Sequence, residues 1–449
     1  MLSQRSNTHF YFVMIAGILS ALAYAVLAFA SVRKVGVSLS LLLTVMSVAW
    51  IAILVVFLRC RHTQDRACTT IIILFGLLFR VIGIFGAPIM EDDYYRYLWD
   101  GRTFATTGSP YRAPPSASFS DSSLPSEFQE LLDNIDNPDL MTIYGPVAQG
   151  SFLLSYLMDP GKIWPLKLIL FLADIALLWL LLCELRSAQI VLYAWCPLLI
   201  QEVSFTAHVD ILGVVFLCCG LLLLRRTSFP FGGLLVGLAT CVKPFALLFT
   251  PLFFEKSMRR ELLIFLAVLL IVYGPFLLMG QSPGIASLFE MLKTFEFNSA
   301  LYAIVSLLCS PLLSKIILTL FYGFFFSSFW YAYLKCRRSK HPRGDWLIGV
   351  LLLCSTVVNP WYLLWLLPFV VLFPTVWGVS ALALVTLSYA TADTLGLSQL
   401  GPYDHPPWVR SLEYFGIGTA LLIELLVVRW RYALRHDKRS RRNAFETER

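Results

Sequence analysis

Long apolar stretches recur along this chain, and they constrain its fold more than any other feature of the sequence. A helix that crosses a bilayer needs about 20 mostly apolar residues, and several stretches reach that length. Of the 449 residues, 58% are hydrophobic and 14% are charged, and the mean hydropathy is +0.73. Soluble domains usually carry about 25% charged residues. Lipid is therefore the solvent for most of this protein, which excludes a soluble enzyme, a disordered chain and a coiled coil.

We expect an all-α, polytopic integral membrane protein, a helical bundle with about 11–14 spans. Several apolar segments are only about 12–16 residues long, too short to cross the bilayer alone. Such segments are tolerated where they lie inside protein or line a cavity, so we expect short or re-entrant helices among the spans. The candidate segments are 10–30, 37–58, 69–87, 143–158, 165–184, 189–205, 209–224, 231–254, 260–279, 299–312, 313–334, 346–358, 361–373, 377–391 and 411–430.

Basic residues predict the orientation of the chain, because Arg and Lys are enriched in short cytoplasmic loops. On this rule the loops around 59–66, 225–226 and 335–343 lie in the cytoplasm, together with the tail 431–449 and the C-terminus. The tail follows a final apolar segment, so we interpret it as a topological signal and expect no nucleic-acid partner. The first apolar segment is too long for a signal peptide and is expected to remain as a helix. The loop residues concerned are Arg59, Arg61, Arg66, Arg225, Arg226, Lys335, Arg337, Arg338, Lys340 and Arg343.

The loop 88–142 has the opposite charge. It carries ten acidic and three basic residues, a net charge of −7, and it follows a helix that starts on the cytoplasmic side. We therefore place it on the outer face of the membrane, and loops of this length are usually functional or disordered. Its middle, 113–126, is rich in Pro and Ser and is expected to be irregular. Residues 92–105 show helical spacing and carry Tyr and Trp, which predicts a helix lying on the bilayer.

Familiar motifs of soluble enzymes are missing from the sequence. None of the ten cysteines falls in the acidic loop, and the adjacent pair Cys218–Cys219 is not a metal-binding spacing. We therefore expect neither a disulfide framework nor a zinc site. The sequence contains no Walker A motif, no G-x-G-x-x-G and no serine nucleophile elbow. A soluble activity powered by a nucleotide is thus unsupported.

The run Glu91-Asp92-Asp93, directly after a membrane helix, is the strongest candidate for chemistry. Three adjacent carboxylates repel one another, which raises a pKa or demands a cation. Beside a bilayer the run is suited to a general base or to a cation site. The alternative is a solvated helix N-terminus, which the helix dipole favours. Arg96 and Arg102 follow, and they either neutralise these acids or hold a phosphate.

His208 and Asp210 lie between two apolar segments, and ionisable groups at a membrane boundary indicate a functional site. Their spacing is not that of a helical metal site, and the alternative is a polar pair facing an outer vestibule. Gln201 and Glu202 are expected to share that vestibule. A late outer loop with Asp393, Asp404 and His405 can add to the same site.

Lys243 precedes Pro244 inside the apolar run 231–254. A lysine there needs a partner or water, and the proline breaks the helix, so an anionic head group or phosphate is the expected partner. The alternative is a lysine that snorkels to the interface. The sequence Asn359-Pro360-Trp361-Tyr362 predicts an interfacial turn, for which an anchor without chemistry is the favoured interpretation.

Taken in order, these motifs resemble a known family. The stretch EDDYYRYLWDGR at 91–102 is similar to the first outer loop of GT-C glycosyltransferases, which are multi-span enzymes that use polyprenyl-phosphate sugars. The order of the motifs resembles the dolichyl-phosphate-mannose-dependent mannosyltransferases of GPI-anchor assembly and their bacterial relatives. Cys196 departs from the family pattern, which has Asn at this position. The resemblance runs from about residue 70 to about residue 390 and includes GSPY at 108–111, YGP at 144–146, YAWCPL at 193–198, HVD at 208–210, KP at 243–244 and NPWY at 359–362.

The resemblance implies an inverting glycosyltransferase embedded in a membrane, the inner (plasma) membrane of a bacterium, with its active site on the periplasmic or extracellular face. It implies a hexose donor on polyprenyl phosphate, with mannose as the family's sugar, and a lipid, glycan or protein acceptor. An outer-loop acid is then the base, which falls on Asp92 or Asp93, with Glu91 preceding them. Membrane lipids are the surrounding partners. The family needs no nucleotide and no obligatory metal or cofactor, which leaves room for a divalent cation.

The resemblance also implies roles for other side chains. Cations that hold the donor phosphate would be Arg96, Arg102 and Lys243. Residues that bind the sugar or the acceptor would be Tyr94, Asp100, Tyr144, His208, Asp210, Asn359 and Tyr362. We assign no metal ligands from the sequence.

The chain divides into four parts on this interpretation. They are an N-terminal helix pair with its loop (1–68), a catalytic core (69–392), a late outer loop with the last membrane helix (393–430) and the basic tail (431–449).

The competing function is a multi-span transporter or flippase, which would also have broken helices and intramembrane charges. The lack of a clear internal repeat and the large acidic loop favour the enzyme. A non-catalytic assembly subunit is favoured least, because it does not need the acidic cluster.

Overall fold

The computed structural model describes residues 2–33, 36–60, 65–185, 187–224, 231–336 and 342–447. Within these ranges the chain forms helices joined by loops, and strand pairing is limited to an isolated bridge between Phe297 and Val357. The predicted all-α, polytopic fold is confirmed.

Helices of two lengths build the bundle. Shorter apolar helices occur among the long ones, as expected, and one of them, Pro244–Phe254, is part of a segment predicted to be continuous over 231–254. Within the described residues the shorter ones are Gln189–Phe205, Asp210–Leu223, Pro244–Phe254, Gly344–Cys354, Pro360–Leu372 and Val376–Tyr389. Within the described residues, seven helices contain a stretch long and apolar enough to cross a membrane, namely α1 (Leu2–Ser31), α2 (Leu39–Cys60), α3 (Arg66–Phe85), α7 (Trp164–Glu184), α12 (Arg259–Leu278), α15 (Pro311–Cys336) and α19 (Pro407–Thr447).

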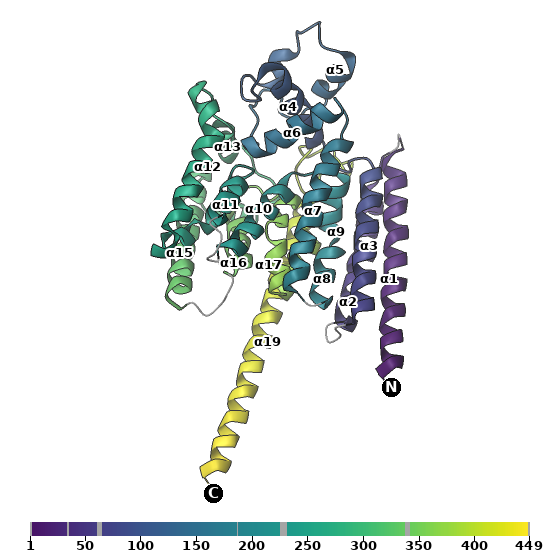
Figure 1. Cartoon of the computed structure of the whole chain (residues 1–449), viewed down its shortest axis with the longest axis vertical. Helices are drawn as coiled ribbons and strands as arrows, with labels where there is room; N and C mark the ends of the chain where they lie inside the picture. Colours follow the sequence, from purple (N-terminus) through teal and green to yellow (C-terminus); the bar gives the residue numbers. More distant parts are fainter. Residues whose placement is uncertain are drawn as a thin grey trace.

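The ends of the bundle differ. The helices of the acidic loop lie at one end, whereas the C-terminal half of α19 extends from the other, where the N-terminus also lies (Figure 1). This arrangement agrees with an acidic loop and a basic tail on opposite faces of a membrane. Six of the basic residues that predict the orientation lie outside the described residues, namely Arg61, Arg225, Arg226, Arg337, Arg338 and Lys340.

A buried arginine ties the N-terminal helices to the rest of the bundle. Arg80 on α3 is fully buried, and its Nε donates to Asp174 of α7 over 2.5 Å. One of its terminal nitrogens donates to the carbonyl oxygen of Ala194 over 2.6 Å, at the end of α8 (Ser187–Ala194). A charge inside a membrane protein is tolerated when its partners are this complete. Arg80 therefore has a structural role and lies outside the candidate site.

The acidic loop forms the two flanking helices that the sequence predicts. Its first flank is α4 (Asp93–Thr107), which packs along α6 (Pro146–Met158). The contact is close because Gly101 has no side chain: a Cβ there would lie 2.4 Å from the carbonyl oxygen of Phe152. The intervening residues hold only the short η1 (Pro115–Ser118) and α5 (Ser126–Asp133). The loop also has its own small apolar core of Leu98, Trp99, Leu124, Phe128, Leu131, Leu132 and Ile135.

Two apolar runs are broken at proline, and the breaks position polar side chains. The run 231–254 divides at Lys243 into α11 (Gly232–Thr240) and the 3-10 helix η3 (Pro244–Phe254). Pro197 likewise begins the short α9 (Pro197–Leu199), which leads into the π-helix η2 (Ile200–Phe205) and then α10 (Asp210–Leu223). A proline cannot donate the hydrogen bond that continues a helix, so the chain turns at each point. The remaining elements are η4 (Lys256–Met258), α13 (Ile285–Thr294), α14 (Leu301–Val305), α16 (Gly344–Cys354), η5 (Pro360–Leu364), α17 (Leu367–Leu372), α18 (Val376–Leu384) and η6 (Val385–Tyr389).

Candidate active site

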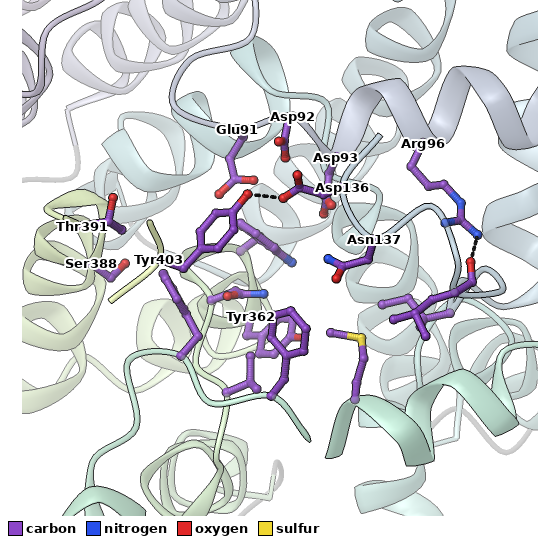
Figure 2. A pocket seen from close by; sticks show the side chains of 18 of the residues that line it. Glu91, Asp92, Asp93, Arg96, Asp136, Asn137, Tyr362, Ser388, Thr391 and Tyr403 are labelled. Carbon is purple, nitrogen blue, oxygen red and sulfur yellow. Dashed lines mark hydrogen bonds between the residues drawn. The ribbon is translucent and has the colours of Figure 1, made fainter. Parts of the chain in front are cut away.

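A cavity of about 620 Å³ opens where the acidic loop meets the helix ends of the bundle. Its wall combines segments that are far apart in the sequence: the start of α4, the end of the acidic loop, the end of α13, the start of η5 and the loop after η6. Figure 2 shows the acids Glu91, Asp92, Asp93 and Asp136 gathered at one part of this wall. Asp393 of the late outer loop lines it as well, whereas Asp404 and His405 do not. Eight residues with a role assigned from the sequence line it, namely Glu91, Asp92, Asp93, Arg96, Tyr144, Lys243, Asn359 and Tyr362.

The acidic run lies at the N-terminus of α4. Asp93 is the first residue of this helix, and Asp92 is its N-cap. Met90, just before the run, has a φ of 58°, a conformation that is uncommon for a residue other than glycine. This turn directs the run into the cavity. The run therefore does form a helix N-terminus, the alternative stated above, and the same acids line a cavity.

Asp93 is held by two tyrosines. Its Oδ2 accepts a hydrogen bond from the hydroxyl of Tyr144 over 2.9 Å and a longer one from that of Tyr97 over 3.4 Å. Tyr111 in turn donates to the main-chain carbonyl of Tyr144 over 2.8 Å. The YGP motif thus fixes one oxygen of Asp93 and leaves the other without these two bonds.

The acids of the cavity raise one another's pKa. Burial raises the pKa of Asp92 to about 7, and the carboxylates of Asp136 and Asp93 add to the rise. Burial also raises the pKa of Glu91, with further contributions from Asp93 and Glu202. Burial raises the pKa of Asp93 as well, against the hydroxyl of Tyr144 and the ammonium of Lys243, which lower it. The cavity therefore concentrates negative charge in a poorly solvated place.

Lys243 brings a positive charge to the same cavity. Its ammonium lies 2.6 Å from Oδ2 of Asp210, whose other oxygen accepts from the indole of Trp365 over 2.7 Å. The ammonium also lies 5.0 Å from the ring centre of Tyr362 and 5.8 Å from that of Tyr144. Asp210 is fully buried and does not line the cavity, so its role is to hold the ammonium of Lys243 in position. The proline break after Lys243 is what lets this residue leave the helix and reach the cavity.

Arg96 is the second cation of the cavity. Its Nε donates to Oδ1 of Asp100 over 2.9 Å, and a terminal nitrogen donates to the carbonyl of Leu140 over 2.9 Å. The amide of Gln149 donates to the other oxygen of Asp100 over 2.7 Å. Asp100 is buried behind Arg96 and does not line the cavity. It therefore positions the guanidinium.

His208 lies behind the wall of the cavity. It is fully buried, and its ring centre is 3.9 Å from that of Trp361, which does line the cavity. Its Nδ1 lies 3.5 Å from the hydroxyl of Tyr97, and its Nε2 lies 3.5 Å from Oε2 of Glu202. His208 and Glu202 are thus neighbours, as expected, but both are fully buried and do not face the outer vestibule that the sequence suggests.

Besides Asp100, Asp210 and His208, which lie behind the wall, two more residues assigned from the sequence do not line the cavity. The guanidinium of Arg102 lies over the rings of Trp99 and Phe128, at 5.5 and 5.2 Å from their centres. Tyr94 packs against Tyr95 with ring centres 4.1 Å apart. Both belong to the face of α4 that covers the small core of the acidic loop.

Several residues at the cavity were not singled out as site residues from the sequence. Tyr403 donates a hydrogen bond to Asp136, which is 267 positions away. Tyr389 lines the cavity and donates to Oε1 of Glu202 over 2.6 Å. Asn137 adopts a φ of 53°, and the Asn-Pro that it forms is a turn signal that the sequence does display. The two tyrosines carry no such local signal.

Comparison with known proteins gives one match. A family model described as "alpha-(1->6)-mannopyranosyltransferase, N-terminal domain" matches residues 10–258, which are 249 of the 449 residues. The match includes the acidic run, Arg96, Tyr144, His208, Asp210 and Lys243. No curated protein and no solved structure matches the chain.

Proposed function

The chain belongs to the alpha-(1->6)-mannopyranosyltransferase family, a family of GT-C-type mannosyltransferases, and from this premise we propose that it transfers mannose from a polyprenyl-phosphate donor. Membership makes the protein a glycosyltransferase and decides against the transporter and the assembly subunit. The acceptor is a lipid or a glycan, and the reaction inverts the anomeric centre. The donor is a substrate, and no organic cofactor takes part.

The observation that carries this proposal is the meeting of acids and cations in one cavity. Glu91, Asp92 and Asp93 line it together with Lys243 and Arg96. Polyprenyl phosphate leaves as an anion, so cations near the leaving oxygen stabilise the transition state. A carboxylate on the other side of the sugar accepts the proton of the acceptor hydroxyl. Both requirements are present within one cavity of about 620 Å³.

We assign the base to Asp92. Asp93 is bonded to the hydroxyls of Tyr144 and Tyr97. Asp92 makes neither of these bonds, lines the cavity and lies close to Asp136 (Figure 2). An acceptor hydroxyl that enters the cavity can therefore reach Asp92 without displacing a tyrosine.

Lys243 and Arg96 hold the donor phosphate. Each is pinned by a buried aspartate, Asp210 for Lys243 and Asp100 for Arg96. Cations fixed in advance need no reorganisation when charge develops on the leaving group. Arg102 is left out of this assignment because its guanidinium packs over Trp99 and Phe128.

Aromatic and amide side chains bind the sugar. The rings of Tyr144, Trp361 and Tyr362 and the amides of Asn137 and Asn359 line the cavity. Apolar ring faces pack against the C–H face of a hexose, and amides bond to its hydroxyls, which is the usual composition of a small-molecule site.

The active site faces the outside of the cell membrane. The cavity opens at the end of the bundle where the acidic loop lies, and the basic tail follows a helix that leaves the opposite end (Figure 1). Positive charge marks the cytoplasmic side, so the acidic end lies in the periplasm or outside the cell. A lipid-borne donor explains why the catalyst is built in a membrane.

A transfer assay with matched variants tests the assignment. The purified protein is incubated with polyprenyl-phosphate mannose and a mannoside acceptor, and products are measured by mass spectrometry. Asp92→Asn is expected to lower the rate by about 10²–10⁴-fold, the usual contribution of a general base. Asp121→Asn is the control, because Asp121 is an exposed acid of the same loop whose carboxylate accepts hydrogen bonds from Ser123, away from the cavity. Full activity of Asp92→Asn in a folded protein would refute the assignment.

A further inference from the structure

Three side chains converge at the acidic wall of the cavity in a way that the transfer reaction leaves unexplained. Glu91, Asp93 and His208 each place one potential ligand atom so that all three atoms lie within 4.8 Å of one another. Three evenly spaced ligand atoms that each lie about 2.1 Å from a small divalent cation are at most about 3.6 Å from one another. Even if all three separations had the upper limit of 4.8 Å, each atom would need to move by only about 0.7 Å to bind one ion.

The burial of His208 places its two ring nitrogens in different surroundings: Nε2 faces Glu202, and Nδ1 lies 3.5 Å from the hydroxyl of Tyr97, which bonds to Asp93. Its side chain is fully buried, and its Nε2 has no hydrogen-bond partner among the described residues. Glu202 is also fully buried, and its Oε2 likewise has no hydrogen-bond partner among the described residues, although it lies 3.5 Å from Nε2 of His208. A buried polar atom without a partner costs about 1–3 kcal/mol, so two such atoms facing one another are unusual.

Glu202 and His208 have the arrangement of a ligand and its support. A histidine that binds a metal through one ring nitrogen commonly donates the N–H of the other to a carboxylate. Glu202 is itself held, since Tyr389 donates to its Oε1 over 2.6 Å. A metal at the acidic wall would draw the imidazole into place and shorten the contact with Glu202.

Asp93 has an oxygen to offer. Both tyrosine hydroxyls bond to its Oδ2, which leaves Oδ1 for another partner. The ammonium of Lys243 is engaged by Asp210 at 2.6 Å and so is not fully available to neutralise the cluster. Two carboxylates this close repel one another unless a cation lies between them.

We propose that Glu91, Asp93 and His208 bind one divalent cation, with Glu202 holding the imidazole of His208. Two carboxylates and one imidazole suit Mn²⁺ or Zn²⁺ better than Ca²⁺, because imidazole is a ligand of transition metals. Glu91 and Asp93 line the cavity, so the open coordination positions of the ion face the substrate. There the ion binds an oxygen of the donor phosphate, a role that rests on the proposed function.

Direct measurement of Mn²⁺ binding tests the site without any sugar substrate. The purified protein is stripped with chelator and titrated with Mn²⁺, and the free ion is followed by electron paramagnetic resonance. One saturable ion per chain is expected. Glu91→Gln and Asp93→Asn, which keep the shape of the side chain, are each expected to weaken binding by about tenfold or more. Absence of saturable binding at millimolar Mn²⁺ would overturn the proposal.

Asp92→Asn is the matched control, because it removes the neighbouring acid that is not in the ligand set. It is expected to bind Mn²⁺ as the unaltered protein does, and equal weakening by Asp92→Asn and Asp93→Asn would also overturn the proposal. Size-exclusion chromatography confirms that each variant is folded. The transfer assay separates the two proposals. Transfer by a protein that binds no Mn²⁺ would contradict the metal site and leave the proposed function standing. Mn²⁺ binding by a protein that transfers no mannose would contradict the proposed function and leave the metal site standing. Binding together with transfer that survives the chelator contradicts only the role of the ion at the phosphate.

Discussion

Arg96 and Arg102 lie six residues apart on α4 and have different surroundings. Arg96 lines the cavity and is ion-paired with Asp100, whereas Arg102 covers Trp99 and Phe128. From the sequence the two are equivalent cations beside an acidic run. The difference arises because six residues on a helix do not return a side chain to the same face. Only one of the two can therefore reach a phosphate in the cavity.

This difference predicts the outcome of two substitutions. Arg96→Met is expected to lower kcat/KM for transfer by about 10²-fold, because a fixed cation at the leaving phosphate is lost. Arg102→Met is expected to change it by less than about twofold, as substitutions away from special features usually do. Steady-state kinetics with a polyprenyl-phosphate donor measures both. Equal losses in the two variants would place the phosphate elsewhere.

A double variant separates catalysis from stability in this test. Arg96→Met leaves Asp100 buried without its ion pair, which destabilises a protein by about 3–5 kcal/mol in comparable cases. Adding Asp100→Asn removes that charge and is expected to restore much of the melting temperature without restoring transfer. Recovery of transfer in the double variant would show that Arg96 acts only on stability.

At the scale of elements, the site depends on where helices are interrupted. Lys243 lies at the break between α11 and η3, and Glu202 lies in the π-helix between α9 and α10. The start of α6 docks on the first of these breaks: the amide of Gly145 donates to the carbonyl of Val242 over 3.3 Å. A Cβ on Gly145 would lie 2.1 Å from the carbonyl oxygen of Cys241. The main chain at Gly145 contacts the main chain of Cys241 and Val242, so no flexible side chain can move aside to make room for a Cβ.

Gly145→Ala is therefore expected to destabilise the protein by about 1–3 kcal/mol, in the range of overpacked cores. Because Lys243 follows the displaced carbonyls, transfer is expected to fall as well. Gly150→Ala is the matched control, since Gly150 is on the same helix and a Cβ there has no neighbour within 4 Å. It is expected to be neutral or to stabilise by up to about 1 kcal/mol. Thermal unfolding in detergent measures both, and equal melting temperatures of the two variants would contradict this account of the break.

The sequence predicts the individual helices better than it predicts which side chains from distant helices contact one another. Hydropathy and proline placement give the apolar segments, the break at Lys243 and the helix that begins at Asp93, because these depend on residues close together in the chain. The bond from Tyr403 to Asp136 and that from Tyr389 to Glu202 join residues 267 and 187 positions apart. No local pattern encodes such pairs. The same limit explains why Arg102 and Tyr94, which carry the family motif, lie outside the cavity.

At the scale of the whole molecule, the bundle brings a water-facing loop and a lipid-facing scaffold to one cavity. Seven long helices among the described residues supply the lipid-facing scaffold. The short broken helices and the turns between them supply Lys243 to the cavity wall and Glu202, His208 and Asp210 behind it. Short helices are tolerated in a membrane only where they are buried in protein or line a cavity, and here they do so. On the proposed function, this arrangement would let the lipid of the donor stay among the helices while its phosphate enters the cavity.

The anomeric course of the reaction tests the central claim most directly. A base that activates the acceptor, with a phosphate leaving from the opposite face, inverts the sugar, so a product with an alpha linkage requires a donor with a beta linkage. Purified protein is given beta-linked and alpha-linked polyprenyl-phosphate mannose separately, and the products are read by nuclear magnetic resonance. The account predicts that only the beta-linked donor is consumed and that polyprenyl phosphate and an alpha-mannoside appear in equal amounts. It also predicts that Asp92→Asn slows the appearance of both by about 10²–10⁴-fold. Use of the alpha-linked donor to give an alpha-mannoside would contradict it.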